Sequence, residues 1–307
     1  MEEVLKRVGG LGLLTLERLK RLHLSSPESV AAAPPSLLAD ILGISEDKAV
    51  ELAEEARREA RLELASALEV LERRRARVEF ITTGVRGLDS ILGGGVETGC
   101  ITEFAGEFGA GKTQLCHQLA VMVQLPEEEG GLGSKAVYLD TEGTFRPERI
   151  LEICEYRGLD SKEVLRGILY ARIKSRDQQL FALSEAARGR FGGARLVLVD
   201  TITGLFTGYR DARERRRYMG RLLRALLDLL AYAIDRGVAI VVCNRPSGEG
   251  SRAVGDPYMA SATSYRILIS RGPGATRSAI LAHSPTGERK SCVLEIREEG
   301  VVDAHAR

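Results

Sequence analysis

The sequence predicts an α/β protein in which a mostly parallel sheet carries helices on both faces. Short apolar runs alternate with helical patterns from residue 100 onward, and the stretch GEFGAGKT (106–113) stands between a strand pattern and a helix pattern. Residues 1–60, by contrast, contain only short helical patterns separated by glycines. Strands that alternate with helices form parallel sheets, because each helix returns the chain to the same end of the sheet. We therefore expect a small helical domain followed by a larger α/β core.

Length and composition are consistent with a folded chain of one large and one small domain. The 307 residues are 44% hydrophobic and 28% charged, which supports a sizeable core. The net charge of +1 means that any binding of nucleic acid has to come from local basic patches. The five cysteines show no C-x-x-C spacing, and no run of 18 apolar residues occurs. We expect a reduced cytoplasmic protein without a zinc site or a membrane span.

Residues 1–60 are expected to form a helix-hairpin-helix-like domain. The stretch RVGGLGLLTLERLKRL (7–22) places glycines between two helical patterns, and a second pair of helices meets near Gly43, with Ser45 as the N-cap. Helices joined through Gly-x-Gly turns can offer backbone N–H groups to DNA phosphates. A plain helical bundle with glycine turns is the alternative.

The rest of the chain divides into a charged linker, residues 61–79, and an α/β core, residues 80–307. The linker ends in LERRRARVE, and the core opens at FITTG. Its expected strands are 100–106, 135–140, 195–200 and 237–244, its expected helices 111–125 and 216–235, and its expected hairpins 265–284 and 291–304.

The stretch GEFGAGKT fits the spacing G-x-x-x-x-G-K-[ST] of a phosphate-binding loop. In such loops the backbone N–H groups surround the phosphates, the lysine reaches the outer phosphates, and the hydroxyl supports Mg²⁺. We therefore expect an ATP site formed by Gly106, Glu107, Phe108, Gly109, Ala110, Gly111, Lys112, Thr113 and the adjoining Gln114.

Two acidic residues follow apolar strand patterns. Asp200 ends LVLVD, the form expected of the acid that supports Mg²⁺ together with Thr113, and Glu142 follows the strand VYLD. Hydrolysis of ATP needs a group that orients water in line with the outer phosphate, and Glu142 is our candidate for it. A solvated carboxylate on a loop is the alternative for Glu142.

A run of arginines, YRDARERRR, precedes the helix pattern at 216–235. Arginines beside tyrosines suit a surface that follows a nucleic-acid backbone and stacks on bases. The expected DNA-binding residues here are Tyr209, Arg210, Arg213, Arg215, Arg216 and Arg217. A solvated helix face is the alternative. The polar stretch 244–257, which contains Arg252, is expected as a loop at the carboxyl edge of the sheet, where ligands bind in open α/β folds.

Three stretches together resemble the archaeal RadA recombinases, which are relatives of bacterial RecA. They are ITTGVRGLDSILGGGVETGCITEFAGEFGAGKTQLCHQLAV, VYLDTEGTFRPERI and LVLVDTIT. The resemblance implies a RecA-like ATPase core that binds ATP and Mg²⁺ and assembles as a filament on single-stranded DNA. Such filaments pair that strand with a homologous duplex and exchange strands. The resemblance also implies that Arg149 lies against the adenine, and that the segments 209–217 and 245–260 are the two DNA-binding loops.

The chain departs from the RadA pattern at several positions. Arg245 stands where the family usually has glutamine, and as a permanent cation it could still touch phosphate. The loop after it is shorter than usual. Where the family has the self-association motif Phe-x-x-Ala, this chain has LASA, Leu64 to Ala67, with leucine in place of phenylalanine. His283-Ser284-Pro285 stands where the family often has Asp-Ser-Pro, and the missing aspartate puts a monovalent-cation site near the ATP in doubt.

These departures leave a second interpretation open. The chain would then be a recombinase paralogue or mediator, which binds ATP and DNA and modulates filaments without exchanging strands. A third interpretation is a hexameric helicase or clock-type ATPase built on the same core. The helical amino-terminal domain and the linker argue against it.

Overall fold

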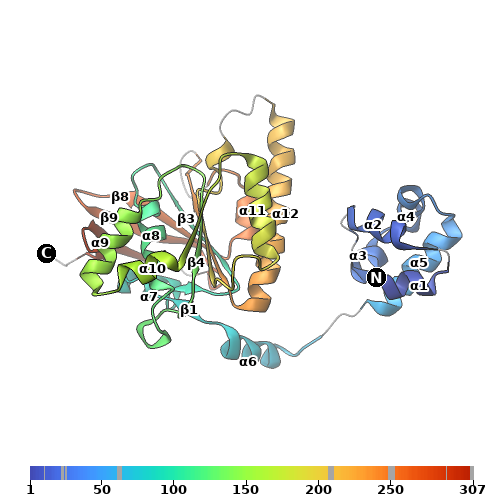
Figure 1. Cartoon of the computed structure of the whole chain (residues 1–307), viewed down its shortest axis with the longest axis horizontal. Helices are drawn as coiled ribbons and strands as arrows, with labels where there is room; N and C mark the ends of the chain where they lie inside the picture. The colour runs from blue at the N-terminus through green and yellow to red at the C-terminus, as the bar shows by residue number, and fades with distance from the viewer. Residues whose placement is uncertain are drawn as a thin grey trace. The chain divides into compact units, whose positions relative to one another are not determined.

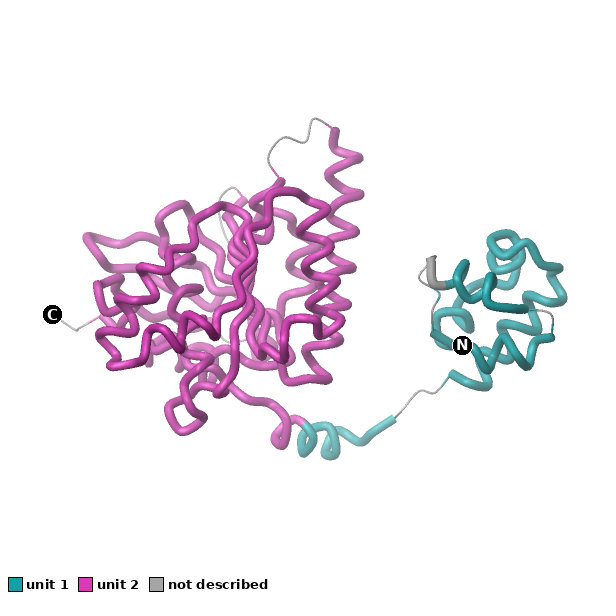
Figure 2. Tube along the Cα trace, viewed as in Figure 1, with its two compact units in different colours: residues 1–73 teal, residues 74–307 magenta. Residues whose placement is uncertain are grey.

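The computed structural model describes residues 1–9, 11–21, 24, 26–60, 64–206, 211–247, 253–287 and 289–304. The chain forms two compact units, residues 1–73 and residues 74–307, which Figure 2 colours separately. The smaller unit is entirely helical within its described part, and the larger unit holds the sheets. The boundary at 73/74 falls inside the stretch 61–79 that the sequence suggested as a linker.

The smaller unit contains five short helices around one apolar core. They are α1 (Glu2–Arg7), α2 (Leu13–Arg21), α3 (Pro27–Ala32), α4 (Pro35–Leu42) and α5 (Glu46–Glu59). Gly43 ends α4 with a φ of 67°, and the Ser45 hydroxyl accepts a hydrogen bond from the Lys48 N–H at the start of α5. The predicted helix end and N-cap are therefore confirmed. Leu19, Leu38 and Leu52 are fully buried between the helices.

The helix α6 (Ala67–Arg77) follows, and none of its residues is buried. Leu64 precedes it with 87% of its surface exposed. Near the end of α6, the Arg74 guanidinium lies 2.6 Å from the buried Glu97 carboxylate, an ion pair within the larger unit.

The larger unit is built on a nine-stranded sheet in the order β11-β10-β9-β8-β3-β7-β6-β4-β5. Its strands are β3 (Ile101–Gly106), β4 (Ala136–Asp140), β5 (Ile168–Arg172), β6 (Leu196–Asp200), β7 (Ala239–Asn244), β8 (Tyr265–Arg271), β9 (Thr276–His283), β10 (Ser291–Arg297) and β11 (Gly300–Asp303). Along this order, the neighbouring strands from β5 across to β8 are parallel. The neighbouring strands from β8 to β11 are antiparallel, and β8–β9 and β10–β11 form two hairpins. The predicted α/β class and the two hairpins are confirmed.

Helices cover both faces of this sheet (Figure 1). One face packs against α7 (Arg86–Leu92), α8 (Lys112–Met122), α9 (Pro147–Arg157) and α10 (Ser161–Arg166). The other packs against α11 (Arg176–Ala187) and the long α12 (Ala212–Arg236), through buried leucines such as Leu183, Leu222 and Leu226. Short elements complete the unit: β1 (Phe80–Ile81) with β2 (Val96–Glu97), the 3-10 turns η1 (Glu127–Glu129) and η2 (Gly204–Phe206), and α13 (Tyr258–Ala262).

The parallel strands β3, β4, β6 and β7 are buried along their whole length, as their apolar sequences predicted. Their carboxyl ends meet at one edge of the sheet, and the phosphate-loop sequence starts there. Within the described residues, no helix has the length and apolar character that a membrane crossing needs.

Candidate nucleotide and nucleic-acid site

The phosphate-loop sequence connects the end of β3 to the start of α8. Gly109 and Gly111 have φ values of 77° and 105°, which side-chain-bearing residues rarely adopt. A Cβ at Gly106 would collide with the carbonyl oxygen of Ile269 on β8, so only glycine fits there. The Lys112 ammonium donates to the carbonyl oxygens of Gly106 at 2.8 Å and Glu107 at 3.0 Å. The Lys112 side chain is therefore held by backbone carbonyls of the loop itself.

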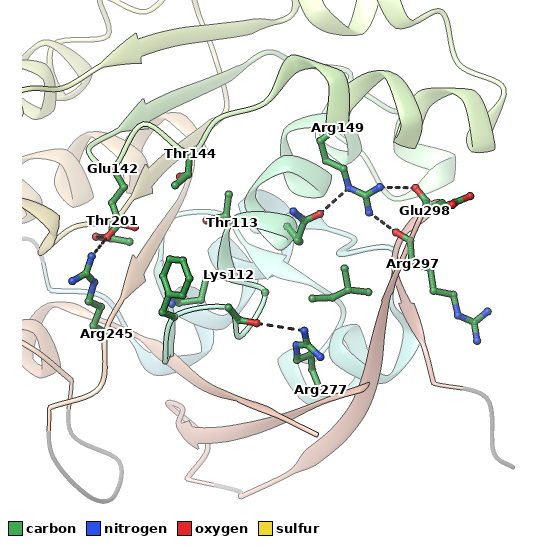
Figure 3. Close-up of a pocket in the computed structure, with 15 residues that line it drawn as sticks. Lys112, Thr113, Glu142, Thr144, Arg149, Thr201, Arg245, Arg277, Arg297 and Glu298 are labelled. Atoms are coloured by element: carbon green, nitrogen blue, oxygen red, sulfur yellow. Dashed lines mark hydrogen bonds and ion pairs between the residues drawn. The ribbon is translucent and has the colours of Figure 1, made fainter. Parts of the chain in front are cut away.

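A cavity of about 740 Å³ opens beside this loop (Figure 3). Nine residues that the sequence predicted for ATP line it: Phe108, Gly109, Gly111, Lys112, Thr113, Gln114, Glu142, Arg149 and Arg245. Gly106, Glu107, Ala110 and Asp200 are not part of the lining. Six further residues of the wall were not predicted: Thr144, Thr201, Arg277, Ile296, Arg297 and Glu298.

Two aspartates lie side by side at the carboxyl ends of β4 and β6, where Asp140 pairs in register with Asp200. Asp140 organises the segment that follows it, since its carboxylate accepts from the backbone N–H groups of Glu142 at 3.0 Å and Gly143 at 2.6 Å. Sequence reasoning assigned Asp140 no role of its own. Its hydrogen bonds hold Glu142 at the cavity wall.

Asp200 is fully buried behind the cavity. Burial raises the pKa of its carboxyl, and hydroxyls, including that of Thr113, oppose the rise. The Tyr138 hydroxyl donates to Oδ2 at 2.9 Å, whereas Oδ1 has no hydrogen-bond partner among the described residues. A buried carboxylate oxygen without a donor is costly unless a cation or an ordered water serves it. The donor set of Asp200 and Thr113, oxygens only, fits Mg²⁺.

Glu142 has an unexpected partner. Its Oε1 accepts from the Arg245 guanidinium at 2.6 Å and from the Thr201 hydroxyl at 3.1 Å (Figure 3). The Glu142 side chain is 18% exposed and the Arg245 side chain 47%. Glu142 is therefore an ion-paired residue of the cavity wall in this structure, and its role in orienting water stays a prediction.

Arg149 forms the far wall of the cavity. Its guanidinium donates to the Gln114 side chain at 2.7 Å and to the backbone carbonyls of Arg297 and Glu298 near the β10–β11 turn (Figure 3). On the same side, Arg277 reaches the carbonyl of Gly109 in the phosphate loop, at 3.4 Å. The terminal hairpins thus complete the cavity, through Arg277, Ile296, Arg297 and Glu298.

A second cavity of about 560 Å³ lies next to the first, and its lining includes Arg215, Arg216, Arg245 and Ser247. The arginines 213–217 are all exposed. They lie in the first turns of α12 rather than in a loop, because Asp211 caps the helix by accepting from the Arg213 N–H at 2.8 Å. The expected helix start at residue 216 is therefore corrected to Ala212. Tyr209, Arg210 and Arg252 fall outside the described residues.

Known proteins resemble this sequence over most of its length. The family model described as Rad51 matches residues 74–304. The chain belongs to the Rad51 family. DNA repair protein RAD51 of Saccharomyces cerevisiae is 37% identical over 315 residues, which cover 97% of this chain and 77% of the yeast protein. DNA repair protein RAD51 homolog B of Zea mays is 38% identical over 315 residues, which cover 97% of this chain and 91% of the maize protein.

Membership of the Rad51 family confirms the predicted RecA-like core and the resemblance to recombinases at the level of the family. Both relatives are eukaryotic proteins, so the narrower expectation of an archaeal RadA protein stays a prediction. The matched range includes both cavities described above, but not Leu64 or Ala67. Leu64 is exposed, and Ala67 is the exposed first residue of α6.

Proposed function

We propose that this chain binds ATP and Mg²⁺, assembles on single-stranded DNA as a filament and exchanges that strand with a homologous duplex. As a Rad51-family protein it acts in DNA repair and homologous recombination, and its enzymatic activity is DNA-dependent hydrolysis of ATP. The observation that carries the proposal is the arrangement of the two cavities: a phosphate loop with a carboxylate lines one, and helix-borne arginines line the other.

In this proposal the wall residues have separate tasks. The phosphate-loop N–H groups and Lys112 bind the phosphates, and Arg149 and Gln114 lie against the base. Thr113 and Asp200 hold Mg²⁺, which supplies charge neutralisation at the phosphate oxygens when it is bound. Glu142 orients the attacking water. Arg245 lies within reach of the outer phosphate because it lines the same cavity.

The DNA-binding face consists of the start of α12 and the neighbouring chain after β7. Arginines at a helix N-terminus oppose the helix dipole, which favours anions there. The cluster at residues 213–217 therefore gains stability when phosphates approach it. Tyr209, Arg210 and Arg252 belong to the same proposed face by sequence position.

Self-association and cellular context complete the proposal. Leu64 and Ala67 would dock on the next copy of the chain in a filament, and leucine in place of phenylalanine would weaken that contact by about 1 kcal/mol. The three-part division into 1–60, 61–79 and 80–307, a cytoplasmic location and an archaeal RadA identity belong to the proposal as well. Duplex DNA and mediator proteins are the remaining expected partners.

A second candidate function is that of a recombinase paralogue or mediator, which modulates filaments without exchanging strands. The ion pair between Arg245 and Glu142 favours it, because it engages the carboxylate that is proposed to orient water. One of the two relatives is named as a homolog B of RAD51, which agrees with either candidate.

The deciding experiment measures ATP-dependent exchange between circular single-stranded DNA and a homologous linear duplex, with electron microscopy of the same mixture. Exchange with helical filaments supports the recombinase. ATP turnover without filaments or exchange supports the paralogue. Closed six-membered rings would support a ring ATPase and contradict both the recombinase and the paralogue. Absence of ATP hydrolysis, with and without DNA, would contradict the proposed ATPase activity.

A further inference from the structure

Thr201 joins the two strand ends that carry the acidic residues of the nucleotide cavity. It follows Asp200 at the end of β6, and it lines the cavity although only 2% of its surface is exposed. Its hydroxyl donates to Glu142 Oε1 at 3.1 Å, across to the segment that follows β4 (Figure 3). None of the binding and catalytic roles proposed for the wall uses this hydroxyl.

The backbone of Thr201 is fixed by Thr141, the first residue after β4. The Thr141 hydroxyl oxygen accepts from the Thr201 N–H at 2.9 Å, and the same hydroxyl donates to the Thr201 carbonyl at 2.8 Å. The Thr141 N–H in turn donates to the Asp200 carbonyl at 2.9 Å. Threonine branches at Cβ and has few rotamers, so a fixed backbone also restricts the direction of the Thr201 hydroxyl.

Gly204 leaves the space in which these hydroxyls lie. A Cβ at this position would stand 2.5 Å from the Thr141 hydroxyl oxygen and 2.9 Å from that of Thr201, too close for non-bonded atoms. It would also stand 3.4 Å from Glu142 Cγ. A side chain at residue 204 would therefore displace the hydroxyls, and the glycine preserves the contact between Thr201 and Glu142.

Glu142 is held at its backbone and at one carboxylate oxygen. Its N–H donates to Asp140 at 3.0 Å, and its Oε1 accepts from Thr201 and from Arg245. Within the described residues, no hydrogen bond engages the second oxygen, Oε2. A group that orients water needs an oxygen with a free lone pair at a defined position. Oε2 has the free lone pairs, and the contacts at Oε1 define its position.

The two donors to Oε1 differ in how firmly they are themselves fixed. The Arg245 side chain is long and 47% exposed, so water competes for its guanidinium. The Thr201 hydroxyl belongs to a short, buried side chain whose backbone is bonded to Thr141. The rotation of the carboxylate is therefore restricted more by the hydroxyl than by the exposed ion pair.

We propose that Thr201 is a positioning residue for hydrolysis, whose hydroxyl turns the Glu142 carboxylate so that Oε2 faces the attacking water. This inference rests on the proposed function, in which Glu142 orients that water. The water oxygen bonds to the terminal phosphorus as the bond to the ADP oxygen breaks, and Thr201 touches neither atom. A displacement of about 1 Å in a positioned group can slow a reaction by about 100-fold, so a small turn of the carboxylate is measurable.

The test compares kcat and KM for ATP in the full chain and in its Thr201→Val variant, at saturating MgCl₂ and with a thymidine oligonucleotide. Valine keeps the shape of threonine and removes the hydroxyl. We expect kcat to fall by about tenfold and KM to change by less than about twofold, because the hydroxyl orients Glu142 and does not bind ATP. Thr201→Ser, which keeps a hydroxyl, should restore most of the lost kcat.

Thr102→Val is the matched control. Thr102 of β3 is fully buried, lines neither cavity, and its hydroxyl has no hydrogen-bond partner among the described residues. Its kinetics should equal those of the unsubstituted chain.

A double variant distinguishes positioning from a merely structural role. In a chain that carries Glu142→Gln, adding Thr201→Val should lower kcat by less than about twofold, because no catalytic carboxylate remains to be turned. A full tenfold loss in that background would show that Thr201 acts independently of Glu142, and would overturn the inference.

Gly204→Ala provides a second measurement if Thr201→Val does not fold. The added methyl group displaces the Thr141 and Thr201 hydroxyls, so kcat should fall while KM stays nearly constant. Unchanged kcat in whichever variant folds would overturn the inference alone. A higher KM with unchanged kcat would assign Thr201 to ATP binding and would also overturn it. An unsubstituted chain that hydrolyses no ATP would overturn the proposed function itself.

Discussion

The Arg149 Nε atom donates to the Gln114 side-chain oxygen at 2.7 Å, and this contact joins helix α9 to helix α8 at the cavity wall. The same guanidinium donates to the carbonyls of Arg297 and Glu298, so it also holds the turn between β10 and β11. One cation therefore organises three elements that are far apart in the sequence. The Arg149 side chain is 12% exposed, which limits its exchange with water.

Replacing Arg149 with alanine should weaken ATP binding by about tenfold, because the Arg297 and Glu298 carbonyls and the Gln114 side-chain oxygen lose their shared donor and the wall loosens. Calorimetric titration with ATP and MgCl₂ measures the change. Glu152→Gln is the control: Glu152 also contacts the Arg149 guanidinium but is 53% exposed, and its loss leaves the other acceptors in place. Equal affinities for Arg149→Ala and the unsubstituted chain would exclude Arg149 from the nucleotide wall.

Lys112→Ala should reduce ATP affinity by about 10- to 100-fold, since a hydrogen bond from a charged group to phosphate contributes about 1.5–3 kcal/mol. The substitution also removes the hydrogen bonds from Lys112 to the Gly106 and Glu107 carbonyls, so the fold of the variant has to be measured as well. Titration with a fluorescent ATP analogue measures the affinity, and thermal unfolding checks the fold. ATP affinity that survives the substitution would remove the phosphate-loop assignment.

Glu142→Gln should leave ATP binding intact and slow hydrolysis by about 10²- to 10⁴-fold, the range for losing a positioned general base. The glutamine oxygen can still accept from Thr201 and Arg245, so the cavity wall keeps its shape. Single-turnover hydrolysis with bound ATP isolates the chemical step from binding. If the variant hydrolyses ATP at the original rate, another group orients the water.

The sequence was informative where residues act through local pattern. The continuous apolar runs of β3, β4, β6 and β7 identify central parallel strands, and the phosphate loop follows from glycine spacing. The edge strand β5 (Ile168–Arg172) was missed. Its sequence ILYAR is short, does not alternate apolar with polar residues and ends in charge, and only Ile168 of the strand is buried.

The far wall of the cavity could not be found in the same way. Arg297 and Glu298 accept from Arg149 through backbone carbonyls, which every residue has, so no side-chain type marks them. Arg277 reaches the phosphate loop only because the β8–β9 hairpin folds over it. The pair between Arg245 and Glu142 joins the segments that follow β7 and β4, two strands that lie on either side of β6. The sequence alone does not give this strand order.

His117 should make the larger unit less stable in mild acid. Burial lowers the pKa of His117 to about 4, and the charge of Arg149 acts in the same direction. Its Nε2 accepts from the Arg146 N–H at 3.1 Å, which requires the neutral ring. The unfolded chain takes up the proton near pH 6.5, so stability falls as pH drops below that value, and the loss ends near pH 4.

By this linkage His117 alone should cost about 2 kcal/mol at pH 5 relative to pH 7.5. Urea unfolding of the unsubstituted chain and of His117→Gln, at both pH values, gives the difference. Glutamine carries no titrating group, so the free energy of unfolding of His117→Gln should fall by about 2 kcal/mol less between pH 7.5 and pH 5 than that of the unsubstituted chain. Parallel pH profiles for the two chains would show that His117 is not protonated differently on unfolding.

The arginines at the start of α12 provide the test of the DNA-binding face. Replacing Arg215, Arg216 and Arg217 together with glutamine should reduce the slope of log affinity against log salt by about 2, since each phosphate contact on a single strand contributes about 0.7. Fluorescence anisotropy of a labelled thymidine oligonucleotide across a salt series measures it. Arg224→Gln, on the same helix but paired with Asp228 at 3.1 Å, should keep the original slope. If the triple variant also keeps it, these arginines are only a solvated helix face, and DNA contacts the chain elsewhere.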